Sequence, residues 1–156
     1  MYTVVYIVNY KEHFMELALL RTLMDKDFHD NHKGIRCPNS IFSKEGRKVK
    51  ATIDAAITTY GRDVTPIEVE ALFFSKNPTL TTAQKDSYQG IFDKVEREVI
   101  MGVDIASDVL SDMFRQHVGE EVANLGFEYV NGEHLSLEPL RAILENYNED
   151  FTPNLS

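Results

Sequence analysis

The sequence predicts an all-α fold: a compact multi-helix globular unit, then a long antiparallel helical hairpin, then a short C-terminal amphipathic helix. Three observations predict it. Apolar residues recur at three- and four-residue steps, the period of a helix that buries one face. Helix start and stop signals separate these stretches. The alternating strands and helices of a nucleotide-binding fold are absent. We place the three parts at residues 1–78, 79–130 and 131–156.

Composition narrows the class of protein. A length of 156 residues fits one domain, and 43% hydrophobic residues suffice for a core. The net charge of −9 argues against nucleic acid as the main partner. The single cysteine, Cys37, excludes an internal disulfide and fits a reducing cytoplasm. Met1–Tyr10 lacks the basic leader and cleavage site of a signal peptide, and no stretch is apolar enough for a membrane span. We therefore expect a soluble, cytoplasmic chain without membrane contact.

The first part begins with an ambiguous segment. Tyr2–Val8 is rich in Val, Ile and Tyr, and strand and helix both remain open for it. Lys11–Met24 has apolar residues over a wide arc, which indicates a central, well-buried helix. The polar run Asp25–Gly34 predicts a solvated loop between helices.

Two further helices complete the globular unit. The first runs from about Ser40 to Tyr60, with Gly61 as its stop. The second begins in the sequence Thr-Pro-Ile-Glu, where Thr65 is a cap, Pro66 occupies the first helical position, and Glu68 completes a capping box.

Two longer helices are expected next. Thr82–Met101 carries a narrow apolar stripe and ends at Gly102, and Asp104–Leu125 repeats apolar residues at four-residue steps and ends at Gly126. Because so short a connection joins them, we expect them to lie antiparallel as a hairpin with apolar surface left for a neighbour.

The last expected helix begins at Ser136. It carries apolar residues at positions i, i+3, i+4 and i+7, which are Leu140, Ile143, Leu144 and Tyr147.

No catalytic machinery is visible in the sequence. The glycine-rich phosphate loop ending in Gly-Lys-Ser/Thr is missing, so this chain alone should not hydrolyse ATP. His29, His32 and Cys37 are metal-ligand residue types, but a structural zinc site needs four ligands, and we interpret them as part of a solvated loop. We expect no catalytic, cofactor or metal site in this chain.

One basic cluster stands out against the acidity. It could contact DNA phosphates or an acidic partner, although a solvated helix face is the plainer interpretation, and it consists of Lys44, Arg47, Lys48 and Lys50.

The order of these elements resembles the N-terminal domain of DnaB-type replicative helicases. The resemblance covers roughly residues 12–147 and rests on order and spacing, because each motif is weak alone. Three stretches carry it: ELALLRTLMDKDF, NSIFSKEGRKVKATIDAAITTYGRDVTPIEVEALF, and VLSDMFRQHVGEEVANLGFEYVNGEHLSLEPLRAILENY. The chain departs from the family in its Val/Ile/Tyr-rich start, in a longer connection around Met101–Ser107, and in lacking the ATPase domain. We expect a portion of a divergent helicase, with a phage gene as one source.

The resemblance implies an assembly role. In that family the N-terminal domains form a collar on a six-membered ring as a trimer of dimers, and they offer a docking surface to primase or a helicase loader. ATP and magnesium belong to the C-terminal ATPase domain, and single-stranded DNA is contacted only indirectly. By position, the expected subunit or partner interface consists of Ile91, Val95, Val99, Met113, Phe114, Val118, Leu140, Ile143 and Leu144.

Two rival interpretations stay open. A stand-alone decoy could copy the collar to bind and inhibit a helicase or primase. An unrelated helical adaptor, or an enzyme that uses the loop with His29 and His32, is the third hypothesis.

Overall fold

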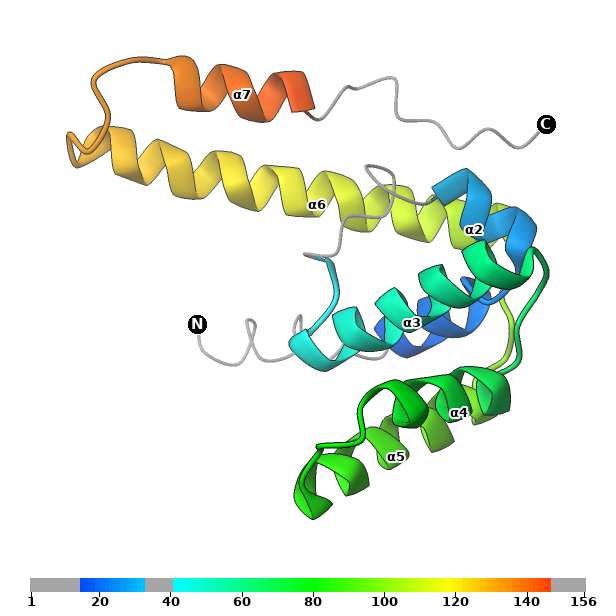
Figure 1. The fold of residues 1–156 in the computed structure, drawn as a ribbon. Coiled ribbons are helices and arrows are strands. Elements are labelled where there is room, and N and C mark those ends of the chain that lie inside the picture. Colours follow the sequence, from blue (N-terminus) through cyan, green and yellow to red (C-terminus); the bar gives the residue numbers. More distant parts are fainter. Residues whose placement is uncertain (1–14, 33–40, 147–156) are drawn as a thin grey trace.

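The computed structural model describes residues 15–32 and 41–146, and in those ranges the chain is helical with no strand (Figure 1). The prediction of an all-α chain is confirmed. No helix in these ranges is long and apolar enough to cross a membrane. Tyr2–Val8, whose structure the sequence left open, and Cys37 lie outside the described residues. Residues 15–22 are helical, and the later helices are α2 (Lys26–His32), α3 (Lys44–Tyr60), α4 (Pro66–Lys76), α5 (Thr82–Arg97), α6 (Val103–Val130) and α7 (Glu138–Asn146).

The body of the molecule is built by residues 15–32, α3, α4, α5 and the first half of α6 (Figure 1). The helices α3, α4 and α5 alternate in direction, and α4 packs against both of the others. One hydrophobic core joins all of these elements, because apolar residues from each are almost completely buried. Its largest completely buried members are Leu19, Leu20, Leu23, Phe28, Ile53, Phe73, Phe92 and Leu110.

A buried carboxylate holds the start of α3. Ser43 caps the helix, and its hydroxyl accepts a hydrogen bond from the backbone N–H of Gly46. Glu16, which is almost fully buried, accepts hydrogen bonds at 2.7 and 2.8 Å from the backbone N–H and the hydroxyl of Ser43. A negative charge at a helix N-terminus also interacts favourably with the helix dipole. Glu16 therefore ties residues 15–22 to α3.

The strongest local signals of the sequence are confirmed. Gly61 ends α3 with φ of 64°, a left-handed conformation that glycine adopts without strain. At the start of α4, the hydroxyl of Thr65 accepts from the N–H of Glu68, and the Glu68 carboxylate accepts from the N–H of Thr65. Pro66 occupies the first turn. This is the expected capping box.

The expected loop at Asp25–Gly34 is wrong for most of its length, because residues 26–32 form α2. Asp25 accepts a hydrogen bond from the N–H of Phe28 at 3.0 Å, so a polar residue starts a helix here instead of a loop. Although most residues of this segment are polar, three of its side chains are buried, which are Phe28, His29 and His32.

The expected hairpin of the two longer helices is not what the structure has. The helix α5 ends at Arg97, packs against α4, and buries Tyr88 and Phe92 around Phe73, with ring centroids 4.6 and 5.4 Å from that of Phe73. The helix α6 instead packs against α7, which runs back along it (Figure 1). The apolar stripe of α5 is a packing face, as expected, but it packs against α4 and not against α6.

We expect Gly46→Ala to lower the free energy of unfolding by about 0.5–2 kcal/mol. A methyl group at this position would overlap the Glu16 carboxylate and displace it from Ser43. The lost hydrogen bonds to a charged group are worth about 1.5–3 kcal/mol, and alanine returns about 1 kcal/mol of helix propensity. Urea unfolding measures the change. Gly90→Ala is the matched control, because nothing lies near its added methyl group, and it should stabilise the chain. Equal effects would contradict the role of Glu16.

The ion pair at the start of α4 predicts a pH effect. Arg62 donates to the Glu68 carboxylate at 2.6 Å, and this bond, followed by those from Thr65, lowers the pKa of Glu68 from 4.5 to about 2. The lowered pKa stabilises the fold above pH 4.5, and this contribution is lost as the pH falls towards 2. Glu68→Gln should keep the capping box, as Gln84 does in α5, and flatten this part of the stability profile measured by urea unfolding. An unchanged acid profile would contradict the assignment.

Candidate functional site

The feature that stands apart from the body is an arm, formed by residues 115–146 of α6 and α7 (Figure 1). The first half of α6 buries Ala106, Leu110 and Phe114, whereas from residue 115 onward only Leu125 is buried. The helix therefore leaves the core at about residue 115 and continues with α7 as its packing partner.

Polar contacts hold the turn at the end of the arm. Gly132 has φ of 75°, which lets the chain reverse after α6. The Tyr129 hydroxyl donates to the carbonyl oxygen of Ser136 at 2.7 Å, and His134 Nε2 lies 3.1 Å from the Glu128 carboxylate. The rings of Tyr129 and His134 are in contact, with centroids 5.3 Å apart. These contacts give the end of the arm a defined shape.

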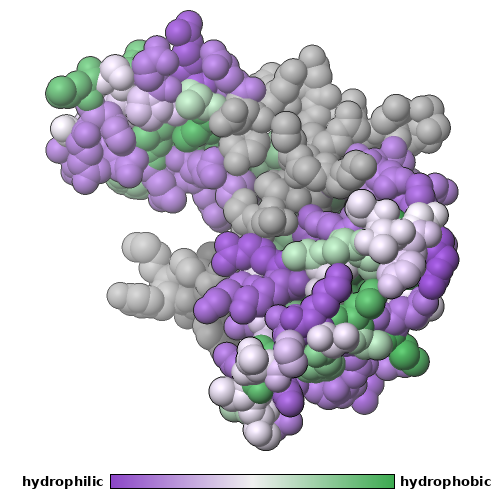
Figure 2. Space-filling view, in the orientation of Figure 1, coloured by the Kyte–Doolittle hydropathy of each residue, from purple (hydrophilic) through white to green (hydrophobic). Residues whose placement is uncertain are grey.

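Large apolar side chains are exposed along the end of this arm. Phe127 is 69% exposed and Val130 is 84% exposed. Leu135, Leu137 and Leu144 are exposed as well. Figure 2 shows hydrophobic residues at the free end of the arm, in the upper left of the view. A cluster of this kind on a protein surface usually marks a contact with another molecule.

The expected interface residues are divided between the core and the surface. Val95 and Phe114 are buried, and Ile91 and Met113 pack against the core. Val118, Leu140 and Ile143 are half-buried on the arm, and only Val99 and Leu144 are exposed. The α5 positions Ile91 and Val95 thus lie against the body, whereas Val118, Leu140, Ile143 and Leu144 lie on the arm.

Sequence reasoning missed Phe127, Val130, Leu135 and Leu137. The predicted helix end at Gly126 placed Phe127, Val130 and Leu135 outside both neighbouring helices. Gly126 lies inside α6, which continues to Val130. Four large apolar residues within eleven positions, separated by polar ones, were the available signal.

The basic cluster is only partly available to a partner. Lys44, Arg47 and Lys48 are exposed on the first turns of α3. Lys50 is almost fully buried and lies 2.9 Å from the carboxylate of Asp54. A phosphate could therefore meet three of the four cations.

A polar cluster joins α2 to α3. His29, which is buried, donates from Nε2 to Asp54 at 2.6 Å, and Lys50 donates to the other oxygen of that carboxylate. Burial acts to raise the pKa of Asp54, but the hydrogen bonds from His29 and Lys50 outweigh it, and the pKa lies below its ordinary value. Because His29 and Lys50 are almost fully buried, we assign this cluster a structural role.

His32 joins α2 to α6. Its Nδ1 donates to the carbonyl oxygen of Phe28 at 2.9 Å, its Nε2 lies 3.2 Å from the Ser107 hydroxyl, and its ring stacks on that of Phe28. His29 and His32 therefore have different partners. Among the described residues, no group of three metal-ligand side chains comes together.

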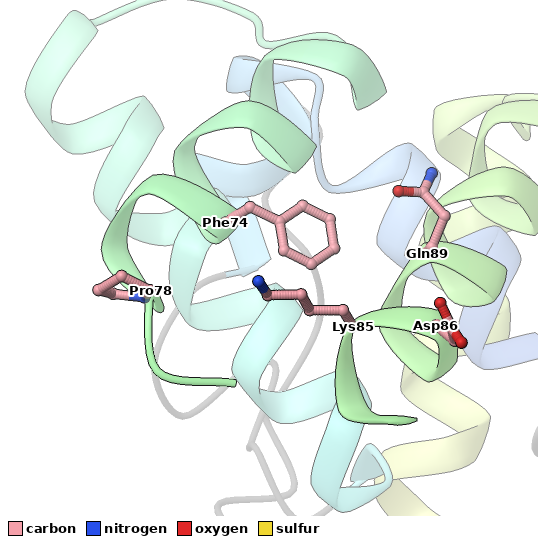
Figure 3. Close-up of a pocket in the computed structure, with 5 residues that line it drawn as sticks. All are labelled: Phe74, Pro78, Lys85, Asp86 and Gln89. Atoms are coloured by element: carbon pink, nitrogen blue, oxygen red, sulfur yellow. The ribbon is translucent and has the colours of Figure 1, made fainter. Parts of the chain in front are cut away.

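A shallow depression of about 320 Å³ lies between α4 and α5 (Figure 3). The ring of Phe74 and the side chain of Lys85 face each other across it, with Asp86 and Gln89 on the α5 side and Pro78 at the turn. It holds no arrangement of nucleophile, base and orienting acid.

Compared with known proteins, the chain matches no family model, no curated protein and no solved structure.

We expect Asp54→Asn to lower the free energy of unfolding by about 1–2 kcal/mol at neutral pH, because it leaves the buried Lys50 without a charged partner. This loss of free energy is smaller than the loss expected for a fully buried ion pair, because the Asp54 side chain is 36% exposed. The effect should shrink as the pH falls below 3.8, because the carboxylate of the unfolded chain is protonated there and the folded one, with its lowered pKa, only at lower pH. Asp112→Asn, which breaks the exposed pair with Arg115, is the control in urea unfolding. Equal losses in the two variants would refute the account.

Proposed function

We propose that this chain is an assembly domain that joins copies of itself through the arm, as the N-terminal collar of a ring-shaped replicative helicase. The observation that carries the proposal is the group of exposed apolar side chains at the end of the arm, including Phe127 and Val130. Burial of such surface contributes about 25 cal/mol per Å².

The form of the arm favours a second copy as its partner. Two antiparallel helices form a flat pair with one face free, and two such pairs can pack as a four-helix arrangement. A symmetric contact of this kind uses the same patch on both chains.

Charge on the arm does not oppose that contact strongly. Glu128 pairs with His134, and Glu138 and Glu145 pair with Arg141. Three of the carboxylates on the arm therefore have partners within their own chain, whereas Glu133, between Val130 and Leu135, forms no ion pair in the described residues. Two copies can approach there with less repulsion than a net charge of −9 suggests.

The helicase setting rests on the motif resemblance. A collar needs a body that offers one surface and an arm that offers another, so that six chains can close a ring through two kinds of contact. On this proposal, ATP and magnesium bind the C-terminal ATPase domain. Primase or a helicase loader is a further partner of the assembled collar.

We expect the chain to form dimers or hexamers at tens of micromolar in native mass spectrometry. Phe127→Glu combined with Val130→Glu should shift it to monomer, because two charges would be buried without partners. The control is Thr58→Glu with Ser87→Glu, which adds the same charge at exposed polar positions of α3 and α5, away from the arm, and should keep the oligomer.

A strict monomer at high concentration contradicts self-assembly. If such a monomer bound an intact replicative helicase, the decoy interpretation would replace the collar.

A further inference from the structure

A second apolar surface lies on the opposite side of the body from the end of the arm, at the elbow, which we define as residues 98–105 between α5 and α6. Val99 is 81% exposed, and Ile100, Val103 and Ile105 are exposed as well. The half-buried Met101 packs against the core between them. Four large exposed apolar residues thus flank Met101, which packs against the core.

The elbow is fixed at both ends. The N–H of Glu98 bonds to the carbonyl oxygens of Lys94 and Val95, and the N–H of Ala106 bonds to that of Gly102. Ala106 is completely buried. Because the backbone is held on either side, the four apolar side chains are presented by a bend of defined shape.

Carboxylates surround this apolar surface. Glu96, Glu98, Asp104 and Asp108 lie within or beside the elbow, against one cation, Arg97. None of these four carboxylates forms an ion pair in the described part of the chain. The arm differs, because Glu128 and Glu138 there have partners of their own. The unpaired carboxylates favour a partner that brings positive charge.

From this pairing of apolar surface and unpaired carboxylates we infer that the elbow docks a basic amphipathic segment of another protein, with apolar residues flanked by Lys or Arg. An apolar core with a charged rim is the usual anatomy of a protein interface. The apolar side chains supply affinity, and the carboxylates select for cations and against acidic segments.

Among the described residues, the exposed basic cluster of a second copy does not meet these requirements. This cluster, Lys44, Arg47 and Lys48, lies on α3, whose apolar residues Val49 and Ile53 are completely buried in its own core. That surface offers charge without an apolar anchor. The inference is independent of assembly through the arm.

The test is binding of a labelled synthetic helix to the full chain, followed by fluorescence anisotropy. The probe is an amphipathic peptide of Leu, Ala and Lys about 18 residues long, enough to form a helix. A peptide with Glu in place of Lys and a scrambled peptide are the controls. We expect the Lys peptide to bind at least about tenfold more tightly than either control, a difference of about 1.4 kcal/mol. Binding should weaken as salt rises from about 0.1 to about 1 M, since screening shortens from about 10 to about 3 Å.

Variants locate the site. Val99→Ser with Ile105→Ser should weaken binding at least tenfold, and Glu96→Gln with Asp108→Asn should remove most of the salt dependence. Phe127→Ser on the arm should leave binding unchanged, so failure here is distinct from failure of arm-mediated assembly. All of these residues are exposed, and circular dichroism checks that the variants fold.

Equal binding of the acidic and basic peptides would overturn the inference. So would unchanged binding by the elbow variants, or loss of self-association in those variants, which would make the elbow a contact between copies.

Discussion

The length of α6 is the constraint on which the rest of the molecule depends. Its 28 residues span about 42 Å, and the body can bury only the first half. Ser111 and Phe114 are the last of its residues to be buried before a run of ten with none. The residues of α6 beyond them must pack against another element, and α7 covers only part of their apolar surface. The arm and its apolar surface follow from this mismatch between the helix and the body.

Attachment of α6 combines apolar and polar contacts. Ala106 and Leu110 enter the common core, while Ser107 meets the buried His32 of α2. A buried histidine needs partners for both ring nitrogens, and Phe28 and Ser107 supply them. That requirement fixes the position of α6 along α2 more narrowly than apolar packing alone, because hydrogen bonds are directional. The direction in which the arm leaves the body is set there.

Sequence patterns predicted what is local in this fold. Gly61 and the Thr65 capping box act over a few residues, so their residue types decide the outcome. Partner choice is not local. The apolar stripe of α5 predicts that it packs, but whether on α4 or α6 depends on the shape of the whole core. The end of α6 was missed for a similar reason, since Gly126 has open space around it and is tolerated inside a helix.

The sequence pattern also did not predict that the two histidines of α2 are buried. His29 and His32 belong to a run of polar letters, which resembles a loop, yet both are buried because Asp54 and Ser107, far away in the sequence, provide their partners. The helix that carries Leu140, Ile143 and Leu144 was predicted because amphipathic spacing in a short helix is again a local signal, and their place in an interface stays a prediction.

Hydrogen–deuterium exchange at several protein concentrations tests most directly whether the arm is an assembly surface. The account predicts that backbone amides of residues 126–144 exchange more slowly as concentration rises, while those of α4 keep the same rates, because only the arm becomes covered. Exchange in the arm that is independent of concentration, or slowing confined to α4 and α5, would contradict it.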